Sequence, residues 1–356
     1  MGLLKLKGRK TTALLLARMC APLIPGWSNP RIRTPDGKSA KVRFAVNSGA
    51  PASRFLRSLT RYSEQMRFKL GLVLCLATSV SAQQSAQTFT FTPVAPRQGQ
   101  VLKVRSGDEA KQARLDGRTI TLFAQTDGLS LGLMPIPVLE KPGVYKLEFL
   151  DKSGNVIDTS PVKVFDAHYP KQNIEIAPSI SALKPSPGEQ DTVNAFRSEV
   201  TPKRYWTEPL DIPVHGCLTS LFGVTRYHNG KPTGDYHAGI DQRAAAGTPI
   251  HAIAAGVVKI VEPYNLRGGT VAIDHGQGLE SIYLHMSKFA VKEGDVVGRG
   301  DVIGYVGSTG RATGPHLHWT IYANGVAVSP LQWVHAVPCP PRKPPVKTKP
   351  RGPSSN

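Results

Sequence analysis

The chain has 356 residues and a formal net charge of +19. Its apolar and charged fractions, 40% and 19%, are those of a globular protein, and no run of about 18 apolar residues predicts a permanent membrane span. The 34 glycines and 30 prolines favour short strands joined by turns over long helices. We therefore expect two domains with tails and an all-β fold class.

The positive charge is concentrated at the two ends of the chain. Residues 1–82 carry a net charge of +13 and residues 338–356 carry +5, so the body between them is nearly neutral. Nucleic-acid binding requires a basic surface on a folded domain, and this charge distribution does not predict one. We expect no nucleic-acid partner.

A secretory signal is predicted inside the sequence, at residues 66–82. A positive start is followed by an apolar core at 70–76 and by small residues up to Ala82. Because export signals normally begin a polypeptide, residues 1–65 are interpreted as over-called sequence before a true initiator at Met66. A long signal or a disordered leader is the alternative. The mature protein is then expected in the periplasm or cell wall, with no stable membrane span.

Two cysteines remain once residues 1–82 are removed, Cys217 and Cys339. In an exported chain an even pair is compatible with one disulfide, which would stabilise the fold by roughly 2–4 kcal/mol. Two free buried thiols are the alternative. The sequence leaves this choice open.

Residues 88–166 are predicted to form a small all-β sandwich. Short β-prone runs, such as 101–104 and 145–149, are separated by turn signals such as Asp116-Gly117. This segment contains no histidine and no cysteine, so we expect no chemistry in it.

The rest of the mature chain divides into three parts. Residues 167–204 are polar and are interpreted as a linker, with a possible helix from Glu189 to Val200. Residues 205–335 are predicted to be the second domain. Residues 338–356 are basic and rich in proline, which predicts a disordered tail.

Nine of the ten histidines lie between His215 and His335. One of them opens the motif His-Ala-Gly-Ile-Asp, which runs from His237 to Asp241. In an extended strand, positions four residues apart share a face, so the imidazole and the carboxylate could reach one ion. Gly239 would keep the space between them clear. This spacing predicts a pair of metal ligands.

A second motif, Gly-Pro-His-Leu-His-Trp, contains His316 and His318. In a strand these two imidazoles share one face, while Leu317 and Trp319 can enter the core. Neutral imidazoles and one carboxylate suit Zn²⁺, and three protein ligands leave a fourth position open, as in catalytic rather than structural sites. Either motif alone is a weak signal. The sequence around the two motifs strengthens the prediction of a metal site.

Across residues 205–335 the chain resembles the lysostaphin-like, LytM-type zinc endopeptidases. The motifs that carry the resemblance occur in that family's order: Ser-Leu-Phe-Gly-Val-Thr-Arg at 220–226, the His-Ala-Gly-Ile-Asp motif, Tyr-Leu-His-Met-Ser at 283–287, Ile-Gly-Tyr-Val-Gly-Ser-Thr-Gly at 303–310, and Gly-Pro-His-Leu-His-Trp at 314–319. The resemblance implies that the C-terminal domain is a β-roll or antiparallel-sheet metallopeptidase. It also relates the N-terminal sandwich to the immunoglobulin-like domains that precede the peptidase in some secreted wall hydrolases.

Carried over residue by residue, the resemblance implies that His237, Asp241 and His318 bind Zn²⁺. His285 and His316 are implied to lie beside the metal as catalytic acid and base groups. The implied reaction is hydrolysis of the peptide crosslinks or stems of bacterial peptidoglycan. A non-catalytic wall-binding regulator that activates another hydrolase is the alternative function.

The segment 293–304 has a hairpin pattern that also occurs in biotinyl and lipoyl carriers. Those carriers need a lysine at the hairpin tip, and this segment contains none. The pattern therefore indicates a similar β-roll and not acyl carriage.

Overall fold

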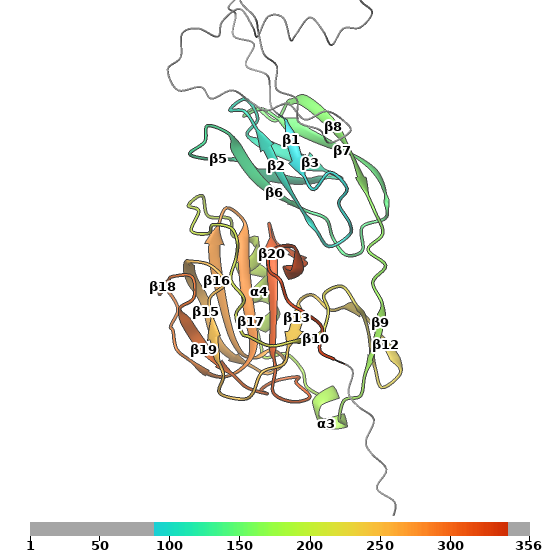
Figure 1. Ribbon diagram of the computed structural model, residues 1–356, viewed down its shortest axis with the longest axis vertical. Coiled ribbons are helices and arrows are strands. Elements are labelled where there is room, and N and C mark those ends of the chain that lie inside the picture. Colours follow the sequence, from blue (N-terminus) through green and yellow to red (C-terminus); the bar gives the residue numbers. More distant parts are fainter. Residues whose placement is uncertain (1–88, 341–356) are drawn as a thin grey trace, which may run out of the picture. The chain divides into compact units, whose positions relative to one another are not determined.

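The structure, a computed structural model, describes residues 89–340, and all of them fall within one compact unit. The expected leader at 1–65, the expected signal at 66–82 and most of the expected tail lie outside these residues. Strands predominate in the described part, which agrees with the all-β expectation (Figure 1). None of the helices between residues 89 and 340 is long and apolar enough to cross a membrane.

The first eight strands form two four-stranded sheets. One has the order β1 (Thr90–Thr92), β2 (Val101–Ser106), β6 (Ser130–Pro135), β5 (Phe123–Ala124), and the other has the order β4 (Arg118–Thr121), β3 (Gln112–Leu115), β7 (Gly143–Leu150), β8 (Val156–Val164). Alternate residues of both sheets, among them Val104 and Phe149, meet in one buried cluster. A β-rich module is thus present, while its immunoglobulin-like topology stays a prediction.

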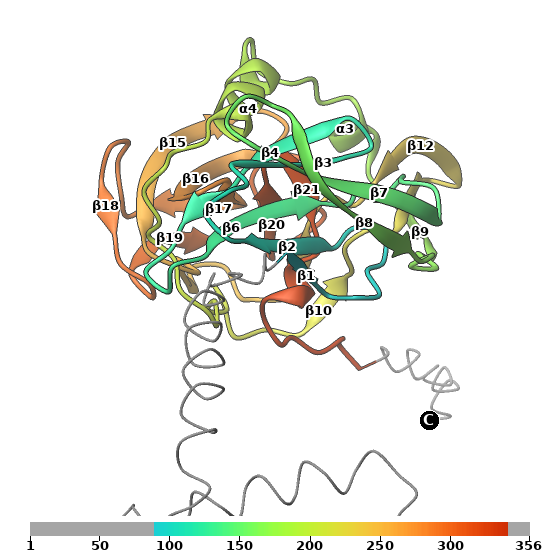
Figure 2. The same cartoon turned by 90° about the horizontal axis from the view of Figure 1, so that it is seen from above.

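The segment that follows the module packs on the next domain. Strand β9 (Lys171–Ile174) pairs in parallel with β11 (Thr225–His228), and helices α3 (Pro178–Ser181) and α4 (Glu189–Ser198) come after it. Helix α4 begins after Gly188, which has a left-handed conformation, and carries Val193 and Phe196 on one buried face. This face contacts β15 (Gly256–Tyr264) (Figure 2).

A ten-stranded sheet forms the C-terminal region. Its main path is β10 (Leu218–Ser220), β13 (Ile240–Gln242), β20 (Leu317–Ala323), β17 (Leu279–Phe289), β16 (Gly268–Gly276), β15 and β18 (Val296–Val297). Strands β14 (Pro249–His251), β19 (Val302–Val306) and β21 (Val326–Val328) branch from it, while β12 (Lys231–Tyr236) pairs with β11, and the 3₁₀ helix η1 (Pro330–Gln332) follows β21. All pairs within the ten-stranded sheet are antiparallel, and β16 is buried along its whole length.

The β module contacts one end of this sheet. Gln125 donates a hydrogen bond to Gln277 (3.1 Å) in the turn between β16 and β17, and Asn324, after β20, donates to the carbonyl of Leu133 (2.7 Å). His318 lies near the start of β20, and six residues of strand extend about 20 Å. The contacts with the module are therefore at the end of β20 opposite to His318.

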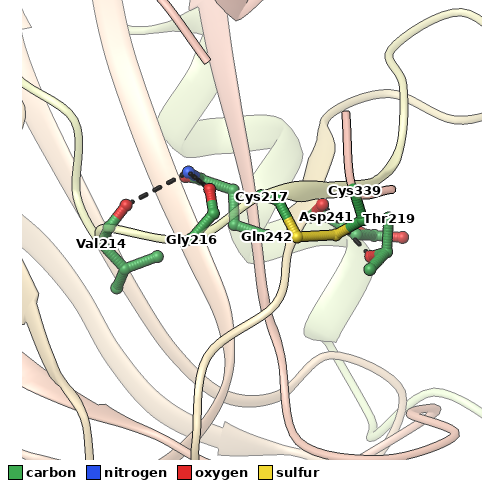
Figure 3. Close-up of a disulfide and its surroundings, with 7 residues drawn as sticks. All are labelled: Val214, Gly216, Cys217, Thr219, Asp241, Gln242 and Cys339. Carbon is green, nitrogen blue, oxygen red and sulfur yellow. Dashed lines mark hydrogen bonds between the residues drawn. A yellow bond between two sulfur atoms is a disulfide. The ribbon is translucent and has the colours of Figure 1, made fainter. Parts of the chain in front are cut away.

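Cys217 and Cys339 form a disulfide, the pairing that the sequence left open (Figure 3). Their Cα atoms lie 4.7 Å apart although 122 residues separate them in the chain. The amide of Cys339 donates to the carbonyl of Leu218 (2.8 Å), and Thr219 donates to the carbonyl of Asp241 (3.2 Å). The disulfide thus joins the residue directly before β10 to a residue near the end of the described chain, and it lies beside β13, the strand that carries Asp241.

Replacing both cysteines, Cys217→Ser with Cys339→Ser, is expected to lower the free energy of unfolding by about 2–5 kcal/mol, because the crosslink restricts a long loop in the unfolded chain. Urea denaturation followed by circular dichroism measures the change. Dithiothreitol should destabilise the parent protein to a similar extent and leave the double variant unaffected. A double variant as stable as the parent would contradict this expectation.

Candidate metal centre

Three side chains from neighbouring segments of the sheet converge on one point. Asp241 on β13 pairs opposite His318 on β20, and His237 lies in the connection between β12 and β13. Nε2 of His237 lies 3.0 Å from Oδ1 of Asp241 and 2.9 Å from Nδ1 of His318, which is itself 2.8 Å from the same oxygen. Within residues 89–340 this is the one group of three or more metal-binding side chains close enough to share an ion.

The backbone between His237 and Asp241 differs from the single extended strand that the sequence predicted. Strand β12 ends at Tyr236 and β13 begins at Ile240, so the motif is not one extended strand. The chain bends at Gly239, where a Cβ atom would lie 2.3 Å from the carbonyl oxygen of Trp319 and 2.8 Å from Nε2 of His318. Glycine is required there because the bend lies directly against β20.

Hydrogen bonds to the outer nitrogens determine which nitrogen of each imidazole faces the cluster. Nδ1 of His237 lies 2.8 Å from the carbonyl oxygen of Leu221, which can only accept, so Nδ1 carries the proton and Nε2 turns a lone pair inward. Nε2 of His318 lies 3.2 Å from the hydroxyl of Thr320, which can accept its proton, and Nδ1 then faces inward in the same way. Two lone pairs 2.9 Å apart beside a carboxylate repel each other unless a positive charge lies between them. The donor set therefore fits Zn²⁺ with one open position.

Burial controls the protonation of these groups. Desolvation lowers the pKa of His318 to about 4, against the opposing effect of Asp241. Burial raises the pKa of Asp241, but the positive charge and the hydrogen bonds that His237 and His318 supply when they are protonated outweigh burial and hold this pKa well below its ordinary value. At neutral pH the site thus offers a carboxylate and a neutral imidazole, the protonation states in which these groups bind a metal.

Residues outside the cluster orient its members. Arg226 donates to Oδ2 of Asp241 (3.2 Å), which leaves Oδ1 for the metal. Ser220, whose hydroxyl lies 3.1 Å from Nδ1 of His237, donates to Gln172 on β9 (2.7 Å). Sequence reasoning assigned no role to these residues. Arg226 could have been found by its position in the motif before His237, whereas the sequence has no signal for Gln172.

His285 and His316 lie next to the cluster, as the resemblance implied. Their ring centroids are 4.9 Å apart, and Nε2 of His316 lies 4.0 Å from Oδ1 of Asp241. Nδ1 of His285 donates to the carbonyl of Thr309 (2.8 Å) and Nδ1 of His316 to that of Gly314 (2.7 Å), so both Nε2 atoms keep a lone pair. The structure thus brings together all five residues singled out in the sequence.

The backbone and the environment of His285 are both unusual. Its φ is +64°, in the left-handed region that residues other than glycine seldom adopt. Burial, together with the neighbouring His316 and His318, lowers the pKa of its imidazole to about 3. His285 is therefore unprotonated at neutral pH, as a proton acceptor must be.

Comparison with known proteins identifies the family. Residues 235–330 match the model of peptidase family M23. A solved chain from Pseudomonas aeruginosa assigned to peptidase M23 is 31% identical, and the alignment covers 68% of this chain and 95% of that one, with a TM-score of 0.52. The chain belongs to peptidase family M23. The resemblance stated from the motifs is thereby confirmed.

Two curated relatives of this M23 chain have descriptive names. The DD-carboxypeptidase/endopeptidase Mpg of Neisseria meningitidis is 45% identical over 124 residues, which are 35% of this chain and 28% of the relative. The peptidoglycan DD-endopeptidase ShyA of Vibrio cholerae is 37% identical over 115 residues, 32% of this chain and 27% of the relative. The match spans less than a third of either relative, so their activities come to this chain only as a proposal.

Proposed function

We propose that the protein is a zinc-dependent endopeptidase that hydrolyses peptide bonds in bacterial peptidoglycan. The observation that carries the proposal is the convergence of His237, Asp241 and His318 on one point, with the free Nε2 atoms of His285 and His316 beside it. Family membership supports the metallopeptidase reaction. The names of the Neisseria and Vibrio relatives support the substrate class.

The roles of the metal, His285 and His316 in the proposed reaction follow from their positions and protonation states. Zn²⁺ held by the three ligands would supply Lewis acidity, which would polarise a peptide carbonyl and lower the pKa of an attacking water. His285, unprotonated at Nε2 and anchored through Nδ1 to Thr309, accepts a proton from that water. His316, held through Nδ1 by Gly314 and with its ring centroid 4.9 Å from that of His285, takes this proton from His285 at its free Nε2 and delivers it to the leaving amine.

The proposal includes export. Peptidoglycan lies outside the cytoplasm, and the sequence of residues 66–82 has the features of a secretory signal. The disulfide between Cys217 and Cys339 supports an oxidising compartment such as the periplasm. In this proposal the immunoglobulin-like module at 88–166 and the segment 167–204 precede a peptidase domain at 205–335.

Metal removal tests this function. Purified protein is incubated with peptidoglycan, new amino groups are counted, and the released muropeptides are identified by mass spectrometry. Chelation is expected to lower the rate at least about 100-fold, and one equivalent of Zn²⁺ is expected to restore it, since the metal provides the Lewis acid. Zinc-loaded protein that releases no new amines would contradict the proposal and favour the wall-binding regulator. The masses of the products identify the bond that is cut.

A further inference from the structure

We propose that Glu189 on helix α4 is a positioning residue for His285 and acts through the loop at 265–267. This inference rests on the proposed function, in which His285 is the general base. Helix α4 lies outside the segment 235–330 that matches the family model.

The carboxylate of Glu189 is fully buried and binds the loop with both oxygens. Oε1 accepts from the amide of Arg267 (3.1 Å) and from its guanidinium (2.8 Å), and Oε2 accepts from the amides of Leu266 (3.3 Å) and Ser186 (2.9 Å). Burying a carboxylate is costly unless donors compensate for the lost water. Four donors do so here, and three of them belong to the loop.

The start of α4 and the residues before it add two further bonds to the same loop. The hydroxyl of Ser186 accepts from the amide of Asn265 (2.8 Å), and Gln190 accepts from the guanidinium of Arg267 (2.9 Å). All three backbone amides of the loop thus donate to side chains of this one segment. Surface loops ordinarily satisfy such amides with water. The loop is therefore held in place against the rest of the sheet.

The loop in turn supports His285 by two paths. The amide of His285 donates to the carbonyl of Arg267 (3.0 Å). The amide of Arg311 donates to the carbonyl of Leu266 (2.9 Å), which ties the loop to the segment containing Thr309, the acceptor for Nδ1 of His285. The backbone and the imidazole of His285 thus depend on the same loop.

The conformation of His285 explains why such support is needed. A non-glycine residue at a φ of +64° is strained and keeps this conformation only when its surroundings impose it. A general base that moves by about 1 Å can lose about 100-fold in rate. Glu189 fixes the carbonyl of Arg267 to which the amide of His285 is bound, and so keeps Nε2 at the reacting water.

The test compares Glu189→Gln and Glu189→Ala in the full chain with Glu199→Gln as a matched control. Glu199 follows the same helix and forms a partly exposed ion pair with Lys259 on β15, 2.7 Å long, that does not involve the loop. With a purified muropeptide dimer as substrate, kcat is expected to fall about 10-fold for Glu189→Gln and about 100-fold for Glu189→Ala. KM, bound zinc and the unfolding temperature of Glu189→Gln are expected to stay near the parent values. Glu199→Gln is expected to match the parent throughout.

Nitrogen-15 NMR of the histidine rings provides a readout that needs no turnover. In the parent protein Nδ1–H of His285 should give a slowly exchanging signal, assigned by its loss in His285→Ala, because it is bonded to Thr309. Glu189→Gln should shift or broaden this signal, while Glu199→Gln should not. If the parent cleaves no muropeptide, the proposed function fails and the NMR comparison still decides the positioning role.

Two results would overturn the positioning role. One is a Glu189→Gln variant with unchanged kcat and an unchanged His285 signal. The other is a fall in kcat that is matched by lost zinc or by a lower unfolding temperature, which would make Glu189 merely structural. Should Glu189→Ala fail to fold, Glu189→Gln alone decides between these outcomes.

Discussion

Asp241→Ala is expected to lose bound zinc and at least about 10³-fold of the peptidase activity. Removing an outer partner of a metal ligand typically costs about 10–100-fold in metal affinity, and loss of the ligand itself should cost more. Asp241 also supplies the negative charge that faces the inward nitrogens of His237 and His318, at 3.0 and 2.8 Å. Without it, two imidazoles alone would hold the ion.

Elemental analysis of dialysed protein measures the zinc, and amine release from peptidoglycan measures the activity. Asp235→Asn is the matched control, because Asp235 is an exposed acid on β12, close in sequence to the site. It should keep one zinc per chain and the parent activity. An Asp241→Ala protein that retains stoichiometric zinc would refute the ligand set.

His285→Ala is expected to reduce kcat by about 10²–10⁴-fold and to leave zinc binding almost unchanged, because general acid–base groups contribute about this much to rate. The geometry separates the two effects. The ring of His285 lies 6.1 Å from that of His318, and its Nδ1 is bonded to Thr309 and not to a ligand.

Zinc content and steady-state rates on a muropeptide dimer, measured on the same preparation, test this expectation. His335→Ala serves as control, since His335 is exposed. Activity at the parent level in His285→Ala would remove His285 from the mechanism. Loss of zinc together with activity would instead make His285 part of the metal site.

Together the two variants distinguish binding from catalysis. Asp241→Ala should lose metal and rate together, whereas His285→Ala should lose rate alone. The two variants also distinguish the proposed enzyme from a wall-binding regulator. A regulator that binds zinc without cleaving peptidoglycan has no cleavage activity for His285→Ala to remove.

Local patterns in the sequence were sufficient to predict the strand that carries His318 and the faces of its side chains. Side chains alternate along a strand, so His316 and His318 were placed on one face, with Leu317 and Trp319 available to the core, and both of these apolar residues are fully buried. The order of the short motifs was sufficient to identify the family. All of these motifs lie within one contiguous segment, so their order can be followed along the sequence alone. The β-rich fold followed in the same way from short runs separated by glycine and proline turns.

The same reasoning was wrong about the path from His237 to Asp241. A strict period of two predicted one strand, but the chain bends at Gly239 because β20 lies directly behind it. A bend forced by a neighbouring strand depends on tertiary contact, which has no counterpart in the local pattern. The two side chains converge nonetheless.

By itself, the sequence determined the fold class, the family and the five side chains at the centre, since each depends on residue type and short spacing. The tertiary structure alone decided what holds those side chains in place. Cys217 pairs with Cys339 across 122 residues, and Glu189 reaches Arg267 across 78. Such partners lie side by side only in the folded structure, where α4 packs on the sheet. No periodicity along the chain can encode a contact of that separation, because it is set by how whole elements pack.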